Sequence, residues 1–281
     1  MKCVEKAYAK VNLTLAVGEK RPDGYHEVVS VMQRVSLCDT LTAERTDSGI
    51  SLACSDPSLP SGEENLAHRA AALFFRETGI VGGAALTLEK RIPSQAGLGG
   101  GSSDAASALL ALRKLYAPAL SDTELETMAA ALGSDVPFFI RGGTQLAIGR
   151  GEVLSPLPPL TDGWFVIVKP AESFSTPAMY RRLDEPGSVL VRNSRYMQDA
   201  VAANNVHAVA AELHNSFERV VPKDSSLRTI KDALRAQGAL ASLLSGSGSA
   251  VFGLFDTETA ACAAVEALRP AWPKIFLTRP V

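Results

Sequence analysis

The chain has 281 residues, of which 46% are apolar and 21% are charged, and its formal net charge is −2. This composition is typical of a soluble globular protein without a basic excess, which argues against nucleic acid as a partner. No apolar run reaches the roughly 18 residues that a membrane-spanning helix needs, and the first residues lack a signal-peptide core, so we expect no membrane association and a cytoplasmic location. The length predicts one large domain or two ordinary ones.

The first forty residues are predicted to form a β-hairpin. Residues 4–17 alternate, with apolar side chains such as Leu13 and Leu15 on one face and Lys10 and Asn12 on the other. A period of two indicates a strand with one buried face. The stretch KRPDGYHE supplies turn chemistry, and the valines that follow it continue as the return strand.

Helices and a strand are predicted over the next hundred residues. ENLAHRAAALFFRETG predicts a helix over 64–79 that ends at the glycine, and AALTLEKRI predicts a strand over 84–92. A glycine-rich stretch comes next and leads into another helix. A further helix is predicted over 121–133, because Ser121 and Glu124 have the spacing of a capping box.

Prolines cluster without periodicity over 154–163, where we expect a linker between an N-terminal domain of residues 1–155 and a C-terminal domain of residues 160–281. WFVIVKP then predicts a short buried strand. Helices are predicted near 175–184, 194–203, 205–221 and 226–237, followed by a strand, a glycine turn, a strand, a helix and a last strand. Because strands and helices interleave, the fold class is mixed α/β or α+β.

The four cysteines, at positions 3, 38, 54 and 262, form no C-x-x-C pair and have no histidine at ligand spacing. Neither a zinc site nor a disulfide framework is indicated, and we expect buried free thiols.

The stretch IPSQAGLGGGSSDAASALLAL, residues 92–112, has the strongest functional signal. Inside a helix, glycine costs roughly 1 kcal/mol relative to alanine, but it permits positive φ and a close approach of the backbone to a ligand. Ser102 or Ser103 can cap the helix that follows, and Asp104 suits its first turn. A glycine loop at a helix N-terminus is a ready anion site.

Three familiar glycine loops fit this stretch poorly. A Walker loop requires a lysine that is absent here. The dinucleotide fingerprint G-x-G-x-x-G would place Ser102 at its third glycine, and it lacks an acidic residue at a strand end about 20 positions later. The glycine-rich loop of protein kinases lies between two strands rather than before a helix.

PSQAGLGGGSSDAA instead resembles the nucleotide-phosphate motif of the GHMP kinases, while AKVNLTL is similar to the first motif of that family and LLSGSGSAVFGLF to its third. The resemblance implies a two-domain α+β fold with the active site in the interdomain cleft, and ATP with Mg²⁺ as the phosphoryl donor. It assigns ATP binding to Asn65, Pro93, Ser94, Gln95, Ala96, Gly97, Leu98, Gly99, Gly100, Gly101, Ser102 and Ser103.

Within this family, AYAKVNLTLAV, RPDGYHEV, LGSDVPFFIRGG and STPAMY are most similar to the kinases that phosphorylate the 2-hydroxyl of a cytidyl-diphosphate-linked methylerythritol in the non-mevalonate isoprenoid pathway. The resemblance makes Asp135 the base and Lys10 its partner at the accepting hydroxyl. The uncharged neighbours of Lys10 on its strand face are unusual for a solvated surface. Asp135 could instead be only a helix cap.

The resemblance also implies a cytosine pocket, with His26 on the base edge, Tyr25 and Tyr180 as the sandwiching rings and Thr176 as a polar contact. Asn65 could contact adenine, cap a helix, or do both. The second glycine turn could serve a second ligand or be a turn without function. The full set of expected substrate-binding residues is Asn12, Tyr25, His26, Thr176, Tyr180, Gly246, Ser247 and Gly248.

Two departures from the family pattern accompany these expectations. HNSFE carries Ser216 where many relatives carry aspartate, and the acidic Mg²⁺ ligand of other GHMP kinases is not found, which leaves Ser103 as the one protein ligand to suggest. The alternatives are a GHMP kinase for a sugar or homoserine, a decarboxylase of the same fold acting on a diphosphate, and a nucleotide-binding protein without catalysis. Retention of Lys10 and Asp135 argues against the last. The oligomeric state stays open between monomer and homodimer.

Overall fold

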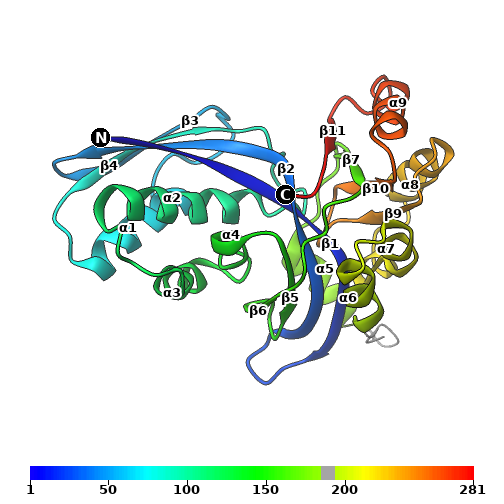
Figure 1. The fold of residues 1–281 in the computed structure, drawn as a ribbon, viewed down its shortest axis with the longest axis horizontal. Helices are drawn as coiled ribbons and strands as arrows, with labels where there is room; N and C mark the ends of the chain where they lie inside the picture. Colours follow the sequence, from blue (N-terminus) through cyan, green and yellow to red (C-terminus); the bar gives the residue numbers. More distant parts are fainter. Residues whose placement is uncertain (185–193) are drawn as a thin grey trace. The chain divides into compact units, whose positions relative to one another are not determined.

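The computed structural model describes residues 1–184 and 194–281, which divide into two compact units (Figure 1). Unit 1 comprises Met1–Ala9, Cys38–Ser94 and Gly99–Gly142, and unit 2 comprises Lys10–Leu37, Gln95–Leu98 and Gly143–Val281. The units interleave along the chain, so they do not test a boundary drawn at one point in the sequence. The domains 1–155 and 160–281 therefore remain a prediction.

The predicted hairpin is confirmed as the first two strands, which are long enough to contribute to both units. In unit 1 the second strand pairs antiparallel with β4 over Thr40–Thr46, and β4 pairs parallel with β3. The order in the sheet is β3-β4-β2-β1. The strands are β1 (Lys2–Lys20), β2 (His26–Thr46), β3 (Gly49–Cys54) and β4 (Gly83–Glu89).

Unit 1 also contains α1 (Leu66–Thr78), α2 (Gly100–Tyr116), α3 (Asp122–Leu132) and α4 (Phe138–Arg141). The predicted helix ends are confirmed for two of them. The Asn65 side chain accepts a hydrogen bond from a backbone N–H of α1, which ends at the left-handed Gly79. Ser121 and Glu124 form both hydrogen bonds of the capping box of α3. Local sequence thus determines where these helices begin and end.

The start of α2 differs from the prediction, because neither Ser102 nor Ser103 caps it. The N-cap is Gly99, whose φ of 72° is left-handed, and no side chain bonds to the free N–H groups. Glycine adopts this conformation without strain, so the helix begins before the serines. Ser103 and Asp104 therefore lie on its buried face, with 1% and 3% of their surface exposed.

Unit 2 contains the rest of β1 and β2 together with β5, β6 and β8, and a second, antiparallel sheet of order β11-β7-β10-β9. Apolar side chains of β7 and β10 pack against α8 and α9 and form the core of that sheet (Figure 1). The elements are β5 (Thr144–Ile148), β6 (Val153–Pro156), β7 (Trp164–Val168), α5 (Thr176–Leu183), α6 (Arg195–Ala202), α7 (Val206–Glu212), β8 (His214–Asn215), α8 (Leu227–Ala236), β9 (Ala241–Leu244), β10 (Val251–Phe255), α9 (Glu258–Leu268) and β11 (Ile275–Thr278).

The helix predicted over 205–221 is wrong beyond Glu212. The chain leaves α7 there, pairs parallel with β1 through β8, and makes a 3-10 turn over Ser216–Arg219. The cause is Asn215, whose side chain accepts a hydrogen bond from the backbone N–H of Phe217. A local side-chain bond of this kind competes with helix formation.

The cysteines are free, but the expectation of four buried thiols is wrong. Cys262 is exposed, and Cys3, Cys38 and Cys54 are half-buried. Separately, none of the helices in residues 1–184 and 194–281 has both the length and the apolar character that crossing a membrane requires.

A buried ion cluster in unit 1 was not predicted. Lys90 follows β4 and donates through Nζ to Oδ2 of Asp39 at 2.5 Å and to Oδ2 of Asp104 at 2.6 Å, and all three side chains are at least nine-tenths buried. Burial raises the pKa of Asp104 to about 7, although Lys90 opposes the shift. Burial lowers the pKa of Lys90, but the two carboxylates outweigh it and hold that pKa above its usual value.

The raised pKa of Asp104 makes the stability of the protein depend on pH. Between the ordinary carboxyl pKa and about 7, the folded state keeps a proton that the unfolded chain has lost. The contribution of Asp104 to the free energy of unfolding is therefore complete at low pH. It is lost as the pH rises towards 7, by up to about 1.4 kcal/mol per pH unit. We expect Asp104→Asn to remove this decrease in stability between pH 5 and 7. Urea unfolding of both proteins from pH 5 to 8 measures the free energy of unfolding at each pH. The same pH dependence in the two proteins would contradict the pKa assigned to Asp104.

Candidate active site

The glycine-rich loop, residues 93–99, has an alternating backbone. Gln95, Gly97 and Gly99 have positive φ angles of 51°, 74° and 72°, whereas the residues between them do not. Positive φ at every second residue is compatible with a nest, in which successive backbone N–H groups bind an anion. Positive φ at Gln95, a residue with a Cβ, is local strain of the kind that clusters at functional sites.

Within unit 2, the middle of this loop is joined to the second glycine turn, residues 245–250. The Ser245 hydroxyl donates to the Gly97 carbonyl at 3.0 Å, and the Ala250 N–H donates to the Ala96 carbonyl at 3.1 Å. A Cβ on Gly97 would lie 2.0 Å from the Ser245 carbonyl oxygen. Glycine at position 97 is thus required by packing of the protein on itself, in addition to its positive φ.

The predicted turn at Gly246–Gly248 is confirmed between β9 and β10. Asn215 holds it by donating from Nδ2 to the carbonyls of Leu244 and Gly246, each at 2.8 Å. No role was predicted for the segment around Asn215, because Ser216 departs from the family pattern, and the partners of Asn215 lie about thirty positions away. Ser247 Oγ lies 2.7 Å from Thr176 Oγ1, so two of the predicted substrate-binding residues are brought together.

From Lys10 onward the polar face of β1 is also buried, which corrects the expectation of one buried face for that part of the strand, while Lys6 is exposed and Tyr8 half-buried as expected. Only 4% of Lys10 and 3% of Asn12 are exposed. Lys10 Nζ donates to Asn12 Oδ1 at 2.6 Å, and the Asn12 amide donates to Ser30 Oγ at 2.8 Å. A buried ammonium is costly unless polar groups surround it, so this face is built for a purpose other than stability.

Lys10 also lies against both glycine segments of unit 2. Its backbone N–H donates to the Leu98 carbonyl at 3.0 Å, and its Nζ would lie 3.4 Å from a Cβ placed on Gly246. Three stretches that the sequence separates by up to 236 positions, from Lys10 to Gly246, therefore converge on one ammonium group.

His26 and Tyr180, two residues of the predicted base pocket, are in contact. Their rings stack with centroids 5.1 Å apart and planes at 24°, and Tyr180 meets Phe217 edge-on. Asp184, which sequence reasoning missed, lies 2.7 Å from His26 Nε2 and 3.2 Å from Lys20 Nζ. The His26 hydrogen bond, aided by Lys20, holds the pKa of Asp184 below its usual value.

Tyr25, the other predicted ring, follows the hairpin turn and is 54% exposed. The Arg150 guanidinium lies over it, 4.9 Å from the ring centroid. An arginine in this position is attracted to the negative face of the ring. An exposed aromatic side chain of this size has a face available for a planar ligand.

The remaining predicted residues belong to unit 1. Asn65 is the N-cap of α1, as one alternative proposed. Asp135 is half-buried in the turn between α3 and α4, where the cap positions are Gly133 and Pro137. Its roles as base or as helix cap both remain predictions. Pro93, Ser94, Gly99, Gly100, Gly101, Ser102 and Ser103 form the ends of the glycine-rich loop and the first turn of α2.

The residues suited to holding Mg²⁺ are few. In the part of the chain that the structure describes, no group of three or more His, Cys, Asp or Glu side chains could hold a metal ion. Ser103, in the first turn of α2, offers a hydroxyl. Such a donor set fits a Mg²⁺ ion that is bound chiefly by phosphate oxygens and water.

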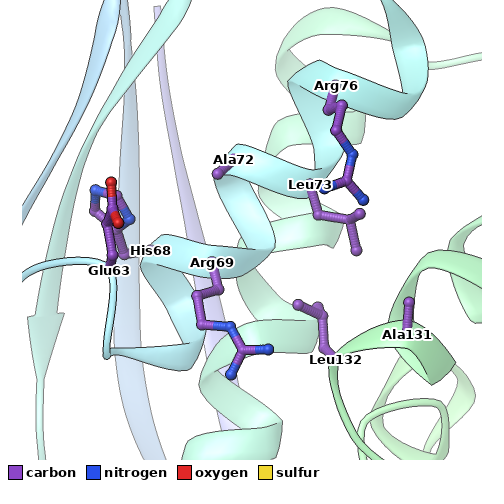
Figure 2. Close-up of a pocket in the computed structure, with 8 residues that line it drawn as sticks. All are labelled: Glu63, His68, Arg69, Ala72, Leu73, Arg76, Ala131 and Leu132. Atoms are coloured by element: carbon purple, nitrogen blue, oxygen red, sulfur yellow. The ribbon is translucent and has the colours of Figure 1, made fainter.

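A pocket of about 510 Å³ lies in unit 1 between α1 and the end of α3 (Figure 2). Figure 2 shows the side chains of Arg69 and Arg76 extending from α1, and Arg76 also donates to Glu77. None of the predicted site residues lines this pocket, so it has no part in the assignments above. Its lining is Glu63, His68, Arg69, Ala72, Leu73, Arg76, Ala131 and Leu132.

The contact between Gly97 and Ser245 leads to a test. We expect Gly97→Ala to destabilise the protein by about 1–3 kcal/mol and to weaken ATP binding, because both the φ angle and the carbonyl of Ser245 exclude a Cβ. Urea unfolding and calorimetric titration with ATP measure the two effects. Gly62→Ala is the control for stability, since nothing lies within 4 Å of a Cβ there. Equal stability of the two variants would contradict the packing role.

Comparison with known proteins supports a family assignment. The model described as "GHMP kinases N terminal domain" matches residues 65–143, and that described as "GHMP kinases C terminal" matches residues 197–274. A protein of Clostridium botulinum (strain Eklund 17B / Type B) named 4-diphosphocytidyl-2-C-methyl-D-erythritol kinase is 38% identical over 277 residues, covering 98% of this chain and 99% of its own. One of the same name from Symbiobacterium thermophilum is 43% identical, covering 94% and 95%.

Solved structures agree with these matches. A crystal structure of 4-(cytidine 5'-diphospho)-2C-methyl-D-erythritol kinase superposes with a TM-score of 0.84 at 40% identity, over 99% of this chain and 100% of that one. A homoserine kinase from Cytophaga hutchinsonii reaches a TM-score of 0.77 at 17% identity, over 99% and 95% of the two chains, and shares the fold alone. By its sequence, its matched domains and its fold, this chain belongs to the GHMP kinase family.

Proposed function

We propose that this protein transfers the γ-phosphoryl group of ATP to the 2-hydroxyl of 4-diphosphocytidyl-2-C-methyl-D-erythritol, a step of the non-mevalonate route to isoprenoid precursors. The observation that best supports this proposal is the similarity of almost the whole chain to enzymes named for that substrate, at 37–43% identity. The substrate is a small molecule, and the cytoplasm, which supplies ATP, is the compartment that we propose for the reaction.

The ATP phosphates would bind to backbone N–H groups of residues 93–103. The alternating φ angles of the loop and the uncapped N–H groups at the start of α2 support this assignment, because both favour an anion. Asn65 is retained as an adenine contact. Its amide already donates one hydrogen to the Pro60 carbonyl and accepts from the Ala67 N–H, so adenine would contact the second amide hydrogen or the second lone pair of the oxygen.

Asp135 is proposed as the base and Lys10 as its partner. An alcohol is a weak nucleophile, so a carboxylate that accepts its proton assists the attack on the γ-phosphorus. The ammonium of Lys10, held by the neutral Asn12, supplies positive charge that favours an ionised carboxylate and an oriented oxygen. Mg²⁺, when bound with ATP, would neutralise phosphate charge. In phosphoryl transfer the protein contributes mainly by aligning the reacting groups and by compensating the charge of the phosphates.

Asp135→Asn tests the role of the base. We expect turnover to fall by about 10²- to 10⁴-fold, because the amide cannot accept the proton, while ATP affinity stays the same. Steady-state ADP release and calorimetric ATP titration separate the two quantities. Asp224→Asn, at an exposed aspartate outside the site, is the matched control. Near-normal turnover in Asp135→Asn would remove its assigned role.

The cytidyl group would bind at His26, Tyr25 and Tyr180. The contact between His26 and Tyr180 supports a shared role, and the bond from His26 Nε2 to Asp184 leaves Nδ1 as the other polar atom of the ring. The hydroxyl pair of Thr176 and Ser247 offers polar contacts to the rest of the substrate. Asn12, Gly246 and Gly248 complete the proposed set of substrate-binding residues.

Tyr180→Ala tests the base pocket. Stacking of a base on an aromatic ring contributes roughly 1–3 kcal/mol, so KM for the cytidyl substrate should rise by roughly 5- to 150-fold while KM for ATP is unchanged. Tyr180→Phe keeps the ring and should restore most of the affinity. Tyr196→Ala, at a tyrosine that is 67% exposed on α6, is the control. An unchanged substrate KM in Tyr180→Ala would refute the pocket.

The reaction itself is tested by ADP release from ATP with a panel of acceptors. We expect turnover with 4-diphosphocytidyl-2-C-methyl-D-erythritol and none with homoserine, mevalonate or galactose. Efficient turnover of an acceptor without the cytidyl group would overturn the proposal, and so would release of carbon dioxide with ADP. If the protein bound ATP and the cytidyl substrate but released no ADP, the result would support the alternative of a nucleotide-binding protein without catalysis.

A further inference from the structure

The buried ion cluster of Asp39, Lys90 and Asp104 joins the two ends of the glycine-rich loop. Asp39 Oδ1 accepts hydrogen bonds from the backbone N–H groups of Arg91 and Ile92, at 2.5 and 2.8 Å. These residues immediately precede Pro93, where the loop begins. Asp104 lies on α2, in the turn that follows Gly99, where the loop ends. Lys90 Nζ connects the two carboxylates.

The cluster also touches the first residue of α2. A Cβ on Gly100 would lie 3.0 Å from Ile92 Cγ2 and 3.6 Å from Lys90 Nζ. The backbone N–H of Gly100 is among the groups that we propose for phosphate binding. A displacement of Lys90 or Ile92 would therefore be transmitted directly to the loop, without any intervening side chain.

We propose that Asp39, Lys90 and Asp104 are positioning residues that clamp the entry and the exit of the glycine-rich loop in the geometry that binds the ATP phosphates. The proposal rests on the proposed function for its ligand. Two buried carboxylates around one ammonium are not expected to stabilise the fold more than apolar residues would, because apolar residues of similar volume often stabilise a core at least as well. What the charges add is a fixed geometry at both ends of a loop that has few side chains of its own.

One atom of the cluster lacks a partner. Among the described residues, no group donates a hydrogen bond to Asp104 Oδ1, although the atom is buried. The charged groups that act on Asp104 are Lys90, at the end of β4, and Asp39, on β2. Asp39 accepts two backbone N–H bonds besides that of Lys90, so the two carboxylates act at opposite ends of the loop, Asp39 at its entry and Asp104 at its exit.

Asp104→Leu breaks the exit end of the clamp and leaves Lys90 paired with Asp39, so no buried charge loses its partner. We expect the Kd for a non-hydrolysable ATP analogue to rise by roughly 10- to 100-fold, as for other small misplacements of a binding group, while KM for the alcohol substrate is unchanged. Asp104→Asn, which can still accept from Lys90, should recover most of the affinity. Lys114→Met removes an ion pair with Glu5 at the other end of α2 and should change neither quantity.

The proposal would be overturned if Asp104→Leu had a lower melting temperature but an unchanged Kd for the ATP analogue, measured at a temperature where the variant is folded. The cluster would then contribute to stability only. Failure of the wild-type protein to bind the analogue would instead contradict the proposed function, so the two failures are distinguishable.

A second variant serves where Asp104→Leu does not fold. Asp39→Ala removes the acceptor of the Arg91 and Ile92 N–H groups at the entry of the loop and leaves Lys90 paired with Asp104. We expect the Kd for the ATP analogue to rise by roughly 10- to 100-fold here too. An unchanged Kd in folded Asp39→Ala would overturn the proposal.

Discussion

The close approach of two backbones, at Gly97 and Ser245, is the constraint on which the site in unit 2 depends. A carbonyl oxygen occupies the space where any other residue at position 97 would carry its Cβ. The contact aligns the loop with the second glycine turn, and the Leu98 carbonyl then accepts the N–H of Lys10. One ammonium group is thereby placed beside two glycine-containing segments of backbone, in agreement with the proposal that this region binds an anionic ligand.

The charged groups of the molecule are of two kinds, exposed ion pairs and buried groups. Most ion pairs near the surface, such as Lys2 with Glu44, are exposed and contribute little to stability. Two sets of buried charged groups, Lys10 and the cluster around Lys90, lie beside residues of the glycine-rich loop and the start of α2. Lys169 is buried elsewhere, where its Nζ donates to the carbonyls of Pro170 and Glu172. Burial of charge is costly, so each of these groups needs the polar partners around it.

Local patterns predicted most of the fold. The hairpin, the caps of α1 and α3 and the glycine turn of β9–β10 each depend on residues adjacent in the sequence, so they could be found there. The start of α2 depends on the left-handed Gly99 and the end of α7 on the local side-chain bond of Asn215, and the predictions there were wrong. The burial of Lys10 depends on contacts with distant segments, which no local pattern indicates. Asn215, Asp184 and Lys90 were missed for the same reason, because an isolated polar residue has no periodicity that distinguishes it from a solvated one.

The division between fold and specificity follows from the same contacts. Homoserine and mevalonate kinases share this fold at 15–18% identity, so the fold alone does not distinguish this chain from them. The residues that we propose for binding the cytidyl group lie on the hairpin that carries Tyr25 and His26, and on α5, whose C-cap is Asp184. Asp184 orients His26, His26 stacks on Tyr180, and Tyr180 packs on Phe217. A histidine held by a carboxylate on one side and a stacked ring on another has a fixed ring orientation, which a hydrogen bond to one particular base edge requires.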